Sequence, residues 1–299
     1  MKVVGLDEIR KSVSLAGAIA AMREALVAQS RGECDTPMPM HLELEPPGGE
    51  IHMKSSYRKG GRHFALKMAG TFATRLYGMV MLVSVETGET LAYFDDGGYL
   101  TDLRTAAVSA MVARELGRVD TVLGILGTGV QARMQAELHA AILPLSEVCV
   151  WGRNRERAAA CAQEIGERLP GLRVAVAYSP AEVAARAKLL VTATASRVPL
   201  LQAVDIQPGT HVSAVGSDSP GKQELDPEIL RRAALLLVDS RAQCERLGEL
   251  QHAPSEASRA IEIGAYCAAP IPFDRGGTTV ADFTGLGVED LFIAEACLG

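Results

Sequence analysis

The residues with the clearest capacity for chemistry form a glycine-rich turn in the middle of the chain. A short apolar run leads into Gly127-x-Gly129-x-x-Ala132, and a helix-like apolar pattern follows. Strand, glycine turn and helix in this order are typical of a dinucleotide fingerprint, although a lone pattern of this kind also occurs in ordinary tight turns. Gly127 allows the sharp turn, Gly129 lets the backbone approach a pyrophosphate, and the amides of Val130 and Gln131 face the phosphates. We therefore predict a cofactor site at Gly127, Gly129, Val130 and Gln131.

The end of the next expected strand indicates which dinucleotide binds. In NAD-binding domains of this type an Asp or Glu at this position accepts hydrogen bonds from the ribose 2′-hydroxyl. Here Arg153, Asn154 and Arg155 follow the strand, with no acid before Glu156. The two arginines could pair with a 2′-phosphate, and Asn154 could contact it or cap the following helix. The alternative is that both arginines are merely solvated. We predict that NADP(H) is favoured over NAD(H).

Three basic residues could handle a substrate carboxylate or a proton. Arg104 lies near the start of an expected helix, and its guanidinium fork suits a carboxylate, although it could instead pair with a neighbouring acid. Lys67 interrupts an otherwise apolar strand. Burial would lower the Lys67 pKa toward a range useful for proton transfer, whereas simple alternation would send it to solvent. Lys54 is a second candidate lysine.

Asp218 follows an apolar strand at its carboxyl end, where ligands of parallel sheets bind. Its carboxylate could hold an amino or iminium nitrogen and exchange a proton with it, or it could simply stabilise a turn. The six histidines and six cysteines show no metal-ligand spacing, so we predict no metal site. No Ser, His and Asp set can be read from the sequence, so we expect the chemistry to come from a nicotinamide.

The elements that must position these residues differ between the two halves of the chain. The first half predicts a helix at 14–30, strands at 40–44, 51–57, 64–69, 79–85 and 90–94, and a helix at 101–116. From residue 119, strands at 122–126, 148–151, 174–177, 189–192, 211–215 and 235–238 alternate with helical stretches or short crossovers. The first pattern indicates an antiparallel α+β unit. The second indicates a Rossmann-type α/β domain with a doubly wound parallel sheet.

Composition limits the class of protein. The chain has 299 residues, 48% hydrophobic and 22% charged, which is ordinary for a globular protein long enough for two domains. The net charge of −6, without a basic block, argues against nucleic acid as the main partner. We expect no signal peptide and no membrane span. Scattered cysteines without a CxxC pair are typical of reduced thiols, so we expect a cytoplasmic protein.

Several motifs, in order along most of the chain, resemble the ornithine cyclodeaminase and mu-crystallin family. They are GYLTDLRTAA at 98–107, the glycine turn, GSDSPGKQEL at 216–225, GEL at 248–250 and GLGVEDL at 285–291. The resemblance implies a Rossmann domain at 119–285 and a smaller substrate-binding and dimerisation domain at 1–118 together with 286–299. We therefore expect a homodimer. The apolar alternation of the first half, which has no obvious second layer of helices, also favours one.

The resemblance also implies roles for individual residues. It matches Arg104 with the family's substrate-binding arginine, and Lys67 and Asp218 with its catalytic residues. Many members have a further carboxylate-binding arginine near residues 37–40, where this chain has none. Either no residue of this chain has the role of that arginine, or Lys54 has it.

The resemblance leaves the reaction open. We predict a reductase of a small carboxylated imine that uses NAD(P)H and runs in reverse as an amino-acid dehydrogenase. One alternative is an ornithine-type cyclodeaminase that releases ammonia with a retained NAD. The other is a dinucleotide-bound binding or structural protein, as in mu-crystallin. The sequence does not identify which imino or amino acid is the substrate.

Overall fold

The computed structural model describes residues 1–45, 48–72 and 75–298. The chain divides into two compact units, 1–108 with 285–299, and 109–284. The first boundary lies inside helix α3 (Tyr99–Glu115). The domain limits expected from the sequence, after residues 118 and 285, stay a prediction.

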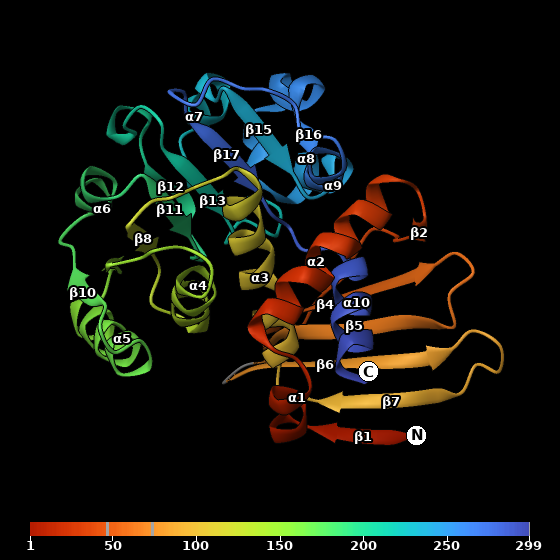
Figure 1. Ribbon diagram of the computed structural model, residues 1–299. Coiled ribbons are helices and arrows are strands. Elements are labelled where there is room, and N and C mark those ends of the chain that lie inside the picture. The colour runs from red at the N-terminus through yellow and green to blue at the C-terminus, as the bar shows by residue number, and fades with distance from the viewer. Residues whose placement is uncertain (46–47, 73–74, 299) are drawn as a thin grey trace. The chain divides into compact units, whose positions relative to one another are not determined.

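The first unit is built on a mixed sheet whose strands are mostly antiparallel (Figure 1). Its order is β1 (Lys2–Gly5), β7 (Thr90–Asp95), β6 (Arg75–Ser84), β5 (His63–Phe72), β4 (Gly49–Arg58) and β2 (Cys34–Asp35), with β3 (Met40–Glu43) also paired to β4. Within the described residues of this unit, only the β1–β7 pair is parallel. All five expected strands are found within a few residues of their predicted limits, whereas β1 and β2 were not predicted.

Helices cover one face of this sheet. Helix α10 (Gly287–Leu298) packs on β4, β5 and β6, and α2 (Leu15–Ser30) packs on α10, while α1 (Leu6–Ser12) contacts β1 and β7 (Figure 1). The side chain of Ser14 caps α2 by accepting a hydrogen bond from the Gly17 amide at 3.0 Å. The expectation that no helical layer covers this sheet is therefore wrong for one face. The covering helix comes from the far end of the chain, so local sequence could not predict it.

The second unit contains a fully parallel sheet. Its order is β10 (Arg173–Val176), β9 (Glu147–Trp151), β8 (Val122–Leu126), β11 (Leu189–Thr192), β13 (His211–Ala214), β17 (Thr279–Asp282), β15 (Leu235–Val238) and β16 (Ile261–Glu262). A small parallel pair joins β12 (Arg197–Leu201) to β14 (Gln223–Leu225). The α/β Rossmann-type prediction is confirmed. Strand β17 was not predicted, because only Val280 and Ala281 in it are apolar and they form no recognisable pattern.

The helices of the second unit follow the strands in the expected alternation. They are α4 (Val130–Ala140), α5 (Arg155–Arg168), α6 (Pro180–Arg186), α7 (Pro227–Arg232), α8 (Arg241–Leu247) and α9 (Ile263–Ala268), with short 3₁₀ turns η1 (Ala203–Asp205), η2 (Glu249–His252) and η3 (Pro254–Arg259). Strands β11, β13, β15 and β17 are buried along their whole length, as expected for parallel strands covered on both faces. Among the described residues, no helix combines the length and apolarity needed to cross a bilayer.

Candidate functional site

The glycine turn lies directly between β8 and α4. Gly127 has φ +139°, and a Cβ atom there would stand 2.5 Å from the carbonyl oxygen of Ala193, so a side chain is excluded at this position. A Cβ added at Gly129 would meet no atom within 4 Å, so the backbone faces open space there. Val130 and Gln131 form the first turn of α4, immediately after this open position. The turn therefore has the shape that the fingerprint predicts.

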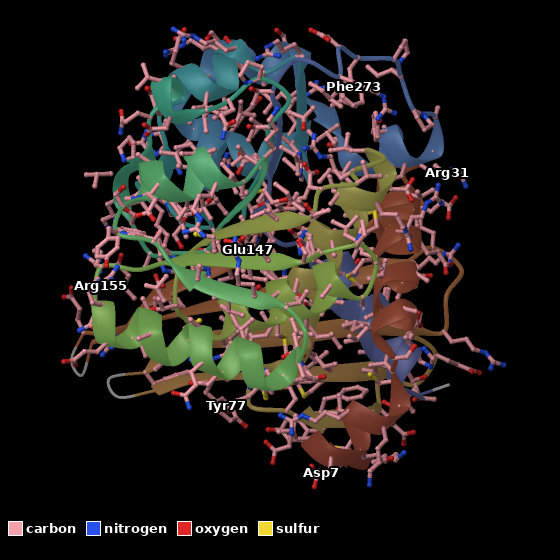
Figure 2. The ribbon with its side chains drawn as sticks, turned by 60° about the vertical axis from the view of Figure 1, so that its left-hand side comes forward. Asp7, Arg31, Tyr77, Glu147, Arg155 and Phe273 are labelled. Atoms are coloured by element: carbon pink, nitrogen blue, oxygen red, sulfur yellow. The ribbon has the colours of Figure 1, made fainter. Side chains whose placement is uncertain are left out.

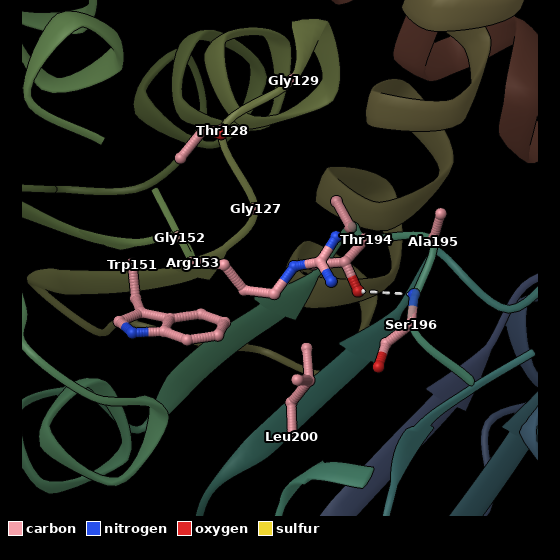
Figure 3. Close-up of a pocket in the computed structure, with 11 residues that line it drawn as sticks. Gly127, Thr128, Gly129, Trp151, Gly152, Arg153, Thr194, Ala195, Ser196 and Leu200 are labelled. Atoms are coloured by element: carbon pink, nitrogen blue, oxygen red, sulfur yellow. Dashed lines mark hydrogen bonds between the residues drawn. The ribbon is translucent and has the colours of Figure 1, made fainter. Parts of the chain in front are cut away.

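A cavity of about 240 Å³ opens at the carboxyl ends of three neighbouring strands (Figure 3). Residues 127–129 after β8, 151–153 at the end of β9 and 193–196 after β11 line it, together with Leu200. Ligands of open parallel sheets bind at this edge, and the start of α4 supplies amides and a positive helix end. In the described part of the chain, no side chain caps α4. These residues fit the pyrophosphate of a dinucleotide.

The three residues after β9 have different positions. Arg153 lines the cavity, and Figure 3 shows its side chain extending toward Thr194. Asn154 caps α5, because its side-chain oxygen accepts a hydrogen bond from the Arg157 amide at 2.9 Å. Arg155, at the start of α5 (Figure 2), donates from Nη1 to the Ala177 carbonyl at 2.7 Å. Its guanidinium carbon lies 4.1 Å from the centre of the Tyr178 ring. Of the two arginines, Arg153 is therefore the one directed into the cavity.

The second unit holds its loops with buried acids that sequence reasoning missed. The Glu224 carboxylate accepts hydrogen bonds from the amide and hydroxyl of Thr194, at 2.6 and 2.7 Å, and from the Gly216 amide at 2.9 Å. Burial raises the pKa of Glu224, while these donors oppose that shift. One carboxylate thus ties a cavity-lining loop to the loop that precedes Asp218. The only signal in the sequence for this buried acid was the pair Glu224-Leu225, which follows the turn at Pro220-Gly221.

Asp218 lies in that loop after β13 with a partly exposed side chain. Its Oδ1 accepts hydrogen bonds from the ammonium of Lys222 at 2.5 Å and from the Ser219 hydroxyl at 3.1 Å. Lys222 and Ser219 thus both hold the Asp218 carboxylate in this loop. Its catalytic role stays a prediction.

The first unit brings the other three candidates together as buried cations. Lys54 and Lys67 are directly opposite each other on β4 and β5, on the face that α10 covers. Lys54 is 9% exposed, Lys67 3% and Arg104 5%. Lys67 is therefore not sent to solvent by strand alternation. Three buried positive charges in one small unit require acidic partners, because burial of an unpaired charge is strongly unfavourable.

Helix α10 supplies acidic partners for Arg104 and Lys67. Arg104 Nη1 donates to Glu289 Oε2 at 3.0 Å, and its Nε lies 3.3 Å from Asp290 Oδ1. Lys67 Nζ lies 3.8 Å from Asp290 Oδ2. Both acids are 1% exposed, and the Asp290 oxygens have no hydrogen-bond partner among the described residues. A buried carboxylate with ion pairs but no hydrogen bonds marks a polar site rather than a packed core.

Gly285 completes this group. Its carbonyl accepts a hydrogen bond from Lys54 Nζ at 2.7 Å, and its backbone has φ +71°. A Cβ atom there would overlap the Arg104 guanidinium, so glycine is required for the close approach. Glu289 and Asp290 were missed as site residues, although their tail motif was noted. Two adjacent acids in a largely apolar final helix were the available signal.

The electrostatics of the group favour proton exchange at Lys67. Burial lowers the pKa of the Lys67 ammonium from 10.5 to about 7, and this effect outweighs the opposing attraction of Asp290. The neighbouring charges of Lys54 and Arg104 act in the same direction as burial and contribute to this lowered pKa. Lys67 can therefore gain and lose a proton near neutral pH.

Comparison with known proteins identifies the family. The model of the ornithine cyclodeaminase/mu-crystallin family matches residues 2–297. The chain belongs to this family. The resemblance inferred from the sequence motifs is thus confirmed over nearly the whole chain.

Individual known proteins are similar to this chain over nearly their full length. The Delta(1)-pyrroline-2-carboxylate reductase of Bacillus cereus is 31% identical over 312 residues, which cover 99% of this chain and 95% of that protein. An archaeal alanine dehydrogenase dimer with bound NAD superposes with a TM-score of 0.90 at 28% identity, over 99% of this chain and 94% of the other. The iminosuccinate reductase of Paracoccus denitrificans, in complex with NAD⁺, superposes with a TM-score of 0.87 at 28% identity, over 100% of this chain and 95% of the other.

Proposed function

We propose that this chain is an NAD(P)H-dependent reductase of a small carboxylated imine, and an amino-acid dehydrogenase in reverse. The observation that carries the proposal is the buried set of Arg104, Lys54 and Lys67 with its acidic partners Glu289 and Asp290. A guanidinium beside lysines suits a substrate carboxylate. The similar proteins described above support this substrate class. They are named as a pyrroline-2-carboxylate reductase, an alanine dehydrogenase and an iminosuccinate reductase, and each name refers to a small carboxylated amine or imine.

The first unit binds and orients the substrate. Arg104 pairs with its carboxylate, and Lys54 adds a second positive charge to the same group. Lys67, with a pKa of about 7, donates a proton to the imine nitrogen during reduction and accepts one during oxidation. Asp290 stabilises the Lys67 ammonium, and therefore sets how readily it forms.

The second unit binds the cofactor and contributes Asp218. The nicotinamide, when bound, supplies the hydride that the imine carbon needs. The turn at Gly127 and Gly129 and the first amides of α4, on Val130 and Gln131, hold the pyrophosphate. Asp218 holds the substrate nitrogen in its charged form, exchanging its contact with Lys222 for this one.

The cofactor proposed is NADP(H) in preference to NAD(H). Support comes from the absence of an acid at 152–155 and from the direction of Arg153 into the cavity. Arg155 contributes less directly, since it is also held by Ala177 and Tyr178, and Asn154 acts as a helix cap. An arginine near the ribose would pair with a 2′-phosphate.

The proposed partner is a second copy of this chain. We propose that the two copies bind through the face of the first unit's sheet that lies opposite α10. Met53, Met68 and Met79 form one cross-strand row there, and Leu66 and Met81 form part of the next. Helix α10 covers the opposite face, on which Lys67 lies, and Leu66 is 38% exposed. An apolar face of this kind requires a partner, and the similar archaeal alanine dehydrogenase is a dimer.

A substrate screen tests the proposed reaction. The full chain is mixed with NADPH and with cyclic and acyclic 2-imino acids, and the nicotinamide absorbance is followed. The matched control is the same imine without its carboxylate, which should not be reduced, because Arg104 would have nothing to bind. Ammonia release from a diamino acid without net absorbance change would replace the proposal by a cyclodeaminase. Cofactor binding without turnover across the panel would favour a binding protein.

A further inference from the structure

Two paired strands of the first unit bring together His41, Glu50 and His52. His41 on β3 lies directly opposite His52 on β4. Glu50 and His52 are two residues apart on β4, so their side chains point to the same face of the sheet. Ligands brought together by strand register have no characteristic spacing in sequence. This is why the sequence predicted no metal site.

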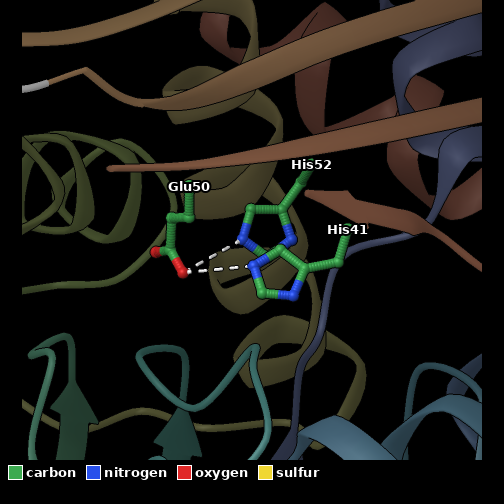
Figure 4. A group of neighbouring side chains, drawn as sticks. All are labelled: His41, Glu50 and His52. Carbon is green, nitrogen blue, oxygen red and sulfur yellow. Dashed lines mark ion pairs between the residues drawn. The ribbon is translucent and has the colours of Figure 1, made fainter. Parts of the chain in front are cut away.

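The three side chains converge on one carboxylate oxygen (Figure 4). His41 Nε2 lies 3.5 Å from Glu50 Oε2, and His52 Nε2 lies 3.7 Å from the same atom. The three candidate ligand atoms all lie within 4.8 Å of one another. The two imidazole rings are stacked, with centres 4.7 Å apart and planes 17° from parallel.

These distances fit ligands around an ion better than direct hydrogen bonds. An N–H···O hydrogen bond measures about 2.7–3.2 Å. Bonds of about 2.0–2.1 Å to a tetrahedral ion place two ligands roughly 3.3–3.4 Å apart. A plain pair in the same unit shows the contrast, since His63 Nδ1 lies 2.8 Å from Glu295 Oε1. The two printed separations from Glu50 Oε2, 3.5 and 3.7 Å, are longer than a hydrogen bond and only slightly longer than this ligand spacing.

We propose that His41, Glu50 and His52 bind one divalent transition-metal ion, with Zn²⁺ as the ion to test. Two imidazoles and one carboxylate suit zinc and its neighbours better than calcium or magnesium, which prefer oxygen ligands. Three protein ligands leave at least one position for water or a small anion. The side chains are 31%, 33% and 17% exposed for His41, Glu50 and His52, so the ion exchanges with solvent.

Metal binding to the untagged full chain, after treatment with a chelator, tests the proposal. Co²⁺ is titrated first, because its visible absorption reports coordination by nitrogen and oxygen ligands, and Zn²⁺ is then measured by competition. We expect one ion per chain. Loss of one ligand in His41→Ala, His52→Ala or Glu50→Gln should weaken binding at least about tenfold, which corresponds to about 1.4 kcal/mol. His63→Ala is the matched control and should leave affinity unchanged.

A second measurement uses the unmodified protein, in case a variant does not fold. Carbethoxylation of histidines by diethylpyrocarbonate is followed by mass spectrometry with and without Zn²⁺. Protection of His41 and His52, but not of His63, supports the site. The proposal is overturned if no ion binds up to about 1 mM, or if bound Zn²⁺ leaves His41 and His52 as reactive as before.

Discussion

Arg153→Ala should remove most of the preference for NADPH over NADH. Arg153 is directed into the cavity at the end of β9, where the 2′ position of the cofactor ribose is expected. A hydrogen bond to a charged group contributes about 1.5–3 kcal/mol. Its loss should raise the Kd for NADPH by roughly 10- to 150-fold. The Kd for NADH should change less than about threefold on the same scale, because NADH has no phosphate there.

Arg155→Ala should have a smaller effect on NADPH. Its guanidinium is held by the Ala177 carbonyl and stacked on Tyr178, so fewer of its donors can turn to the phosphate. The matched control is Arg157→Ala, which removes an exposed arginine of the same helix and should change both affinities less than about twofold.

Both affinities can be measured by titrating the cofactor against protein fluorescence at two salt concentrations. The NADPH affinity of the wild type should fall more steeply with salt than the NADH affinity, because a phosphate contact is screened. Equal affinities in the wild type would refute the reasoning, as would an NADPH preference that survives both Arg153→Ala and Arg155→Ala.

Three further outcomes are expected. Arg104→Ala and Asp218→Asn should each lower kcat/KM by at least about 30-fold, the equivalent of about 2 kcal/mol, with cofactor Kd unchanged; retention of a tenth of the activity in steady-state assays would contradict this. Because burial lowers the pKa of Lys67 to about 7, kcat/KM for reduction should fall as pH rises through 7 and that for oxidation should rise. Lys67→Met should abolish both inflections, and a pH profile that keeps them would exclude Lys67. Leu66→Glu should convert a dimer to a monomer in sedimentation experiments. Val119→Glu, a control at an exposed site of the other unit, should leave the dimer intact. A wild type that sediments as a monomer at micromolar concentration would refute the dimer.

The regular elements were predictable because their signals are local. Alternation with period two identified β4, β5 and β6, and the order of strand, glycine turn and helix identified β8 and α4. Gly127 is a residue type that can adopt the positive φ found in this turn. Strand β17 is the counterexample, since its place between β13 and β15 comes from pairing and not from its own composition.

The sequence by itself determined the type of each domain and the glycine turn of the cofactor site. It also singled out Lys54, Lys67 and Arg104 as candidate site residues. Only the tertiary structure decided what those cations contact. Lys67 and Arg104 contact Asp290 because α10 packs on the sheet. This helix lies far from both residues along the chain. Likewise, strand register alone places His41 opposite His52. Backbone preference depends on neighbours in sequence, whereas burial, pKa and ligand geometry depend on neighbours in space, which long-range packing sets.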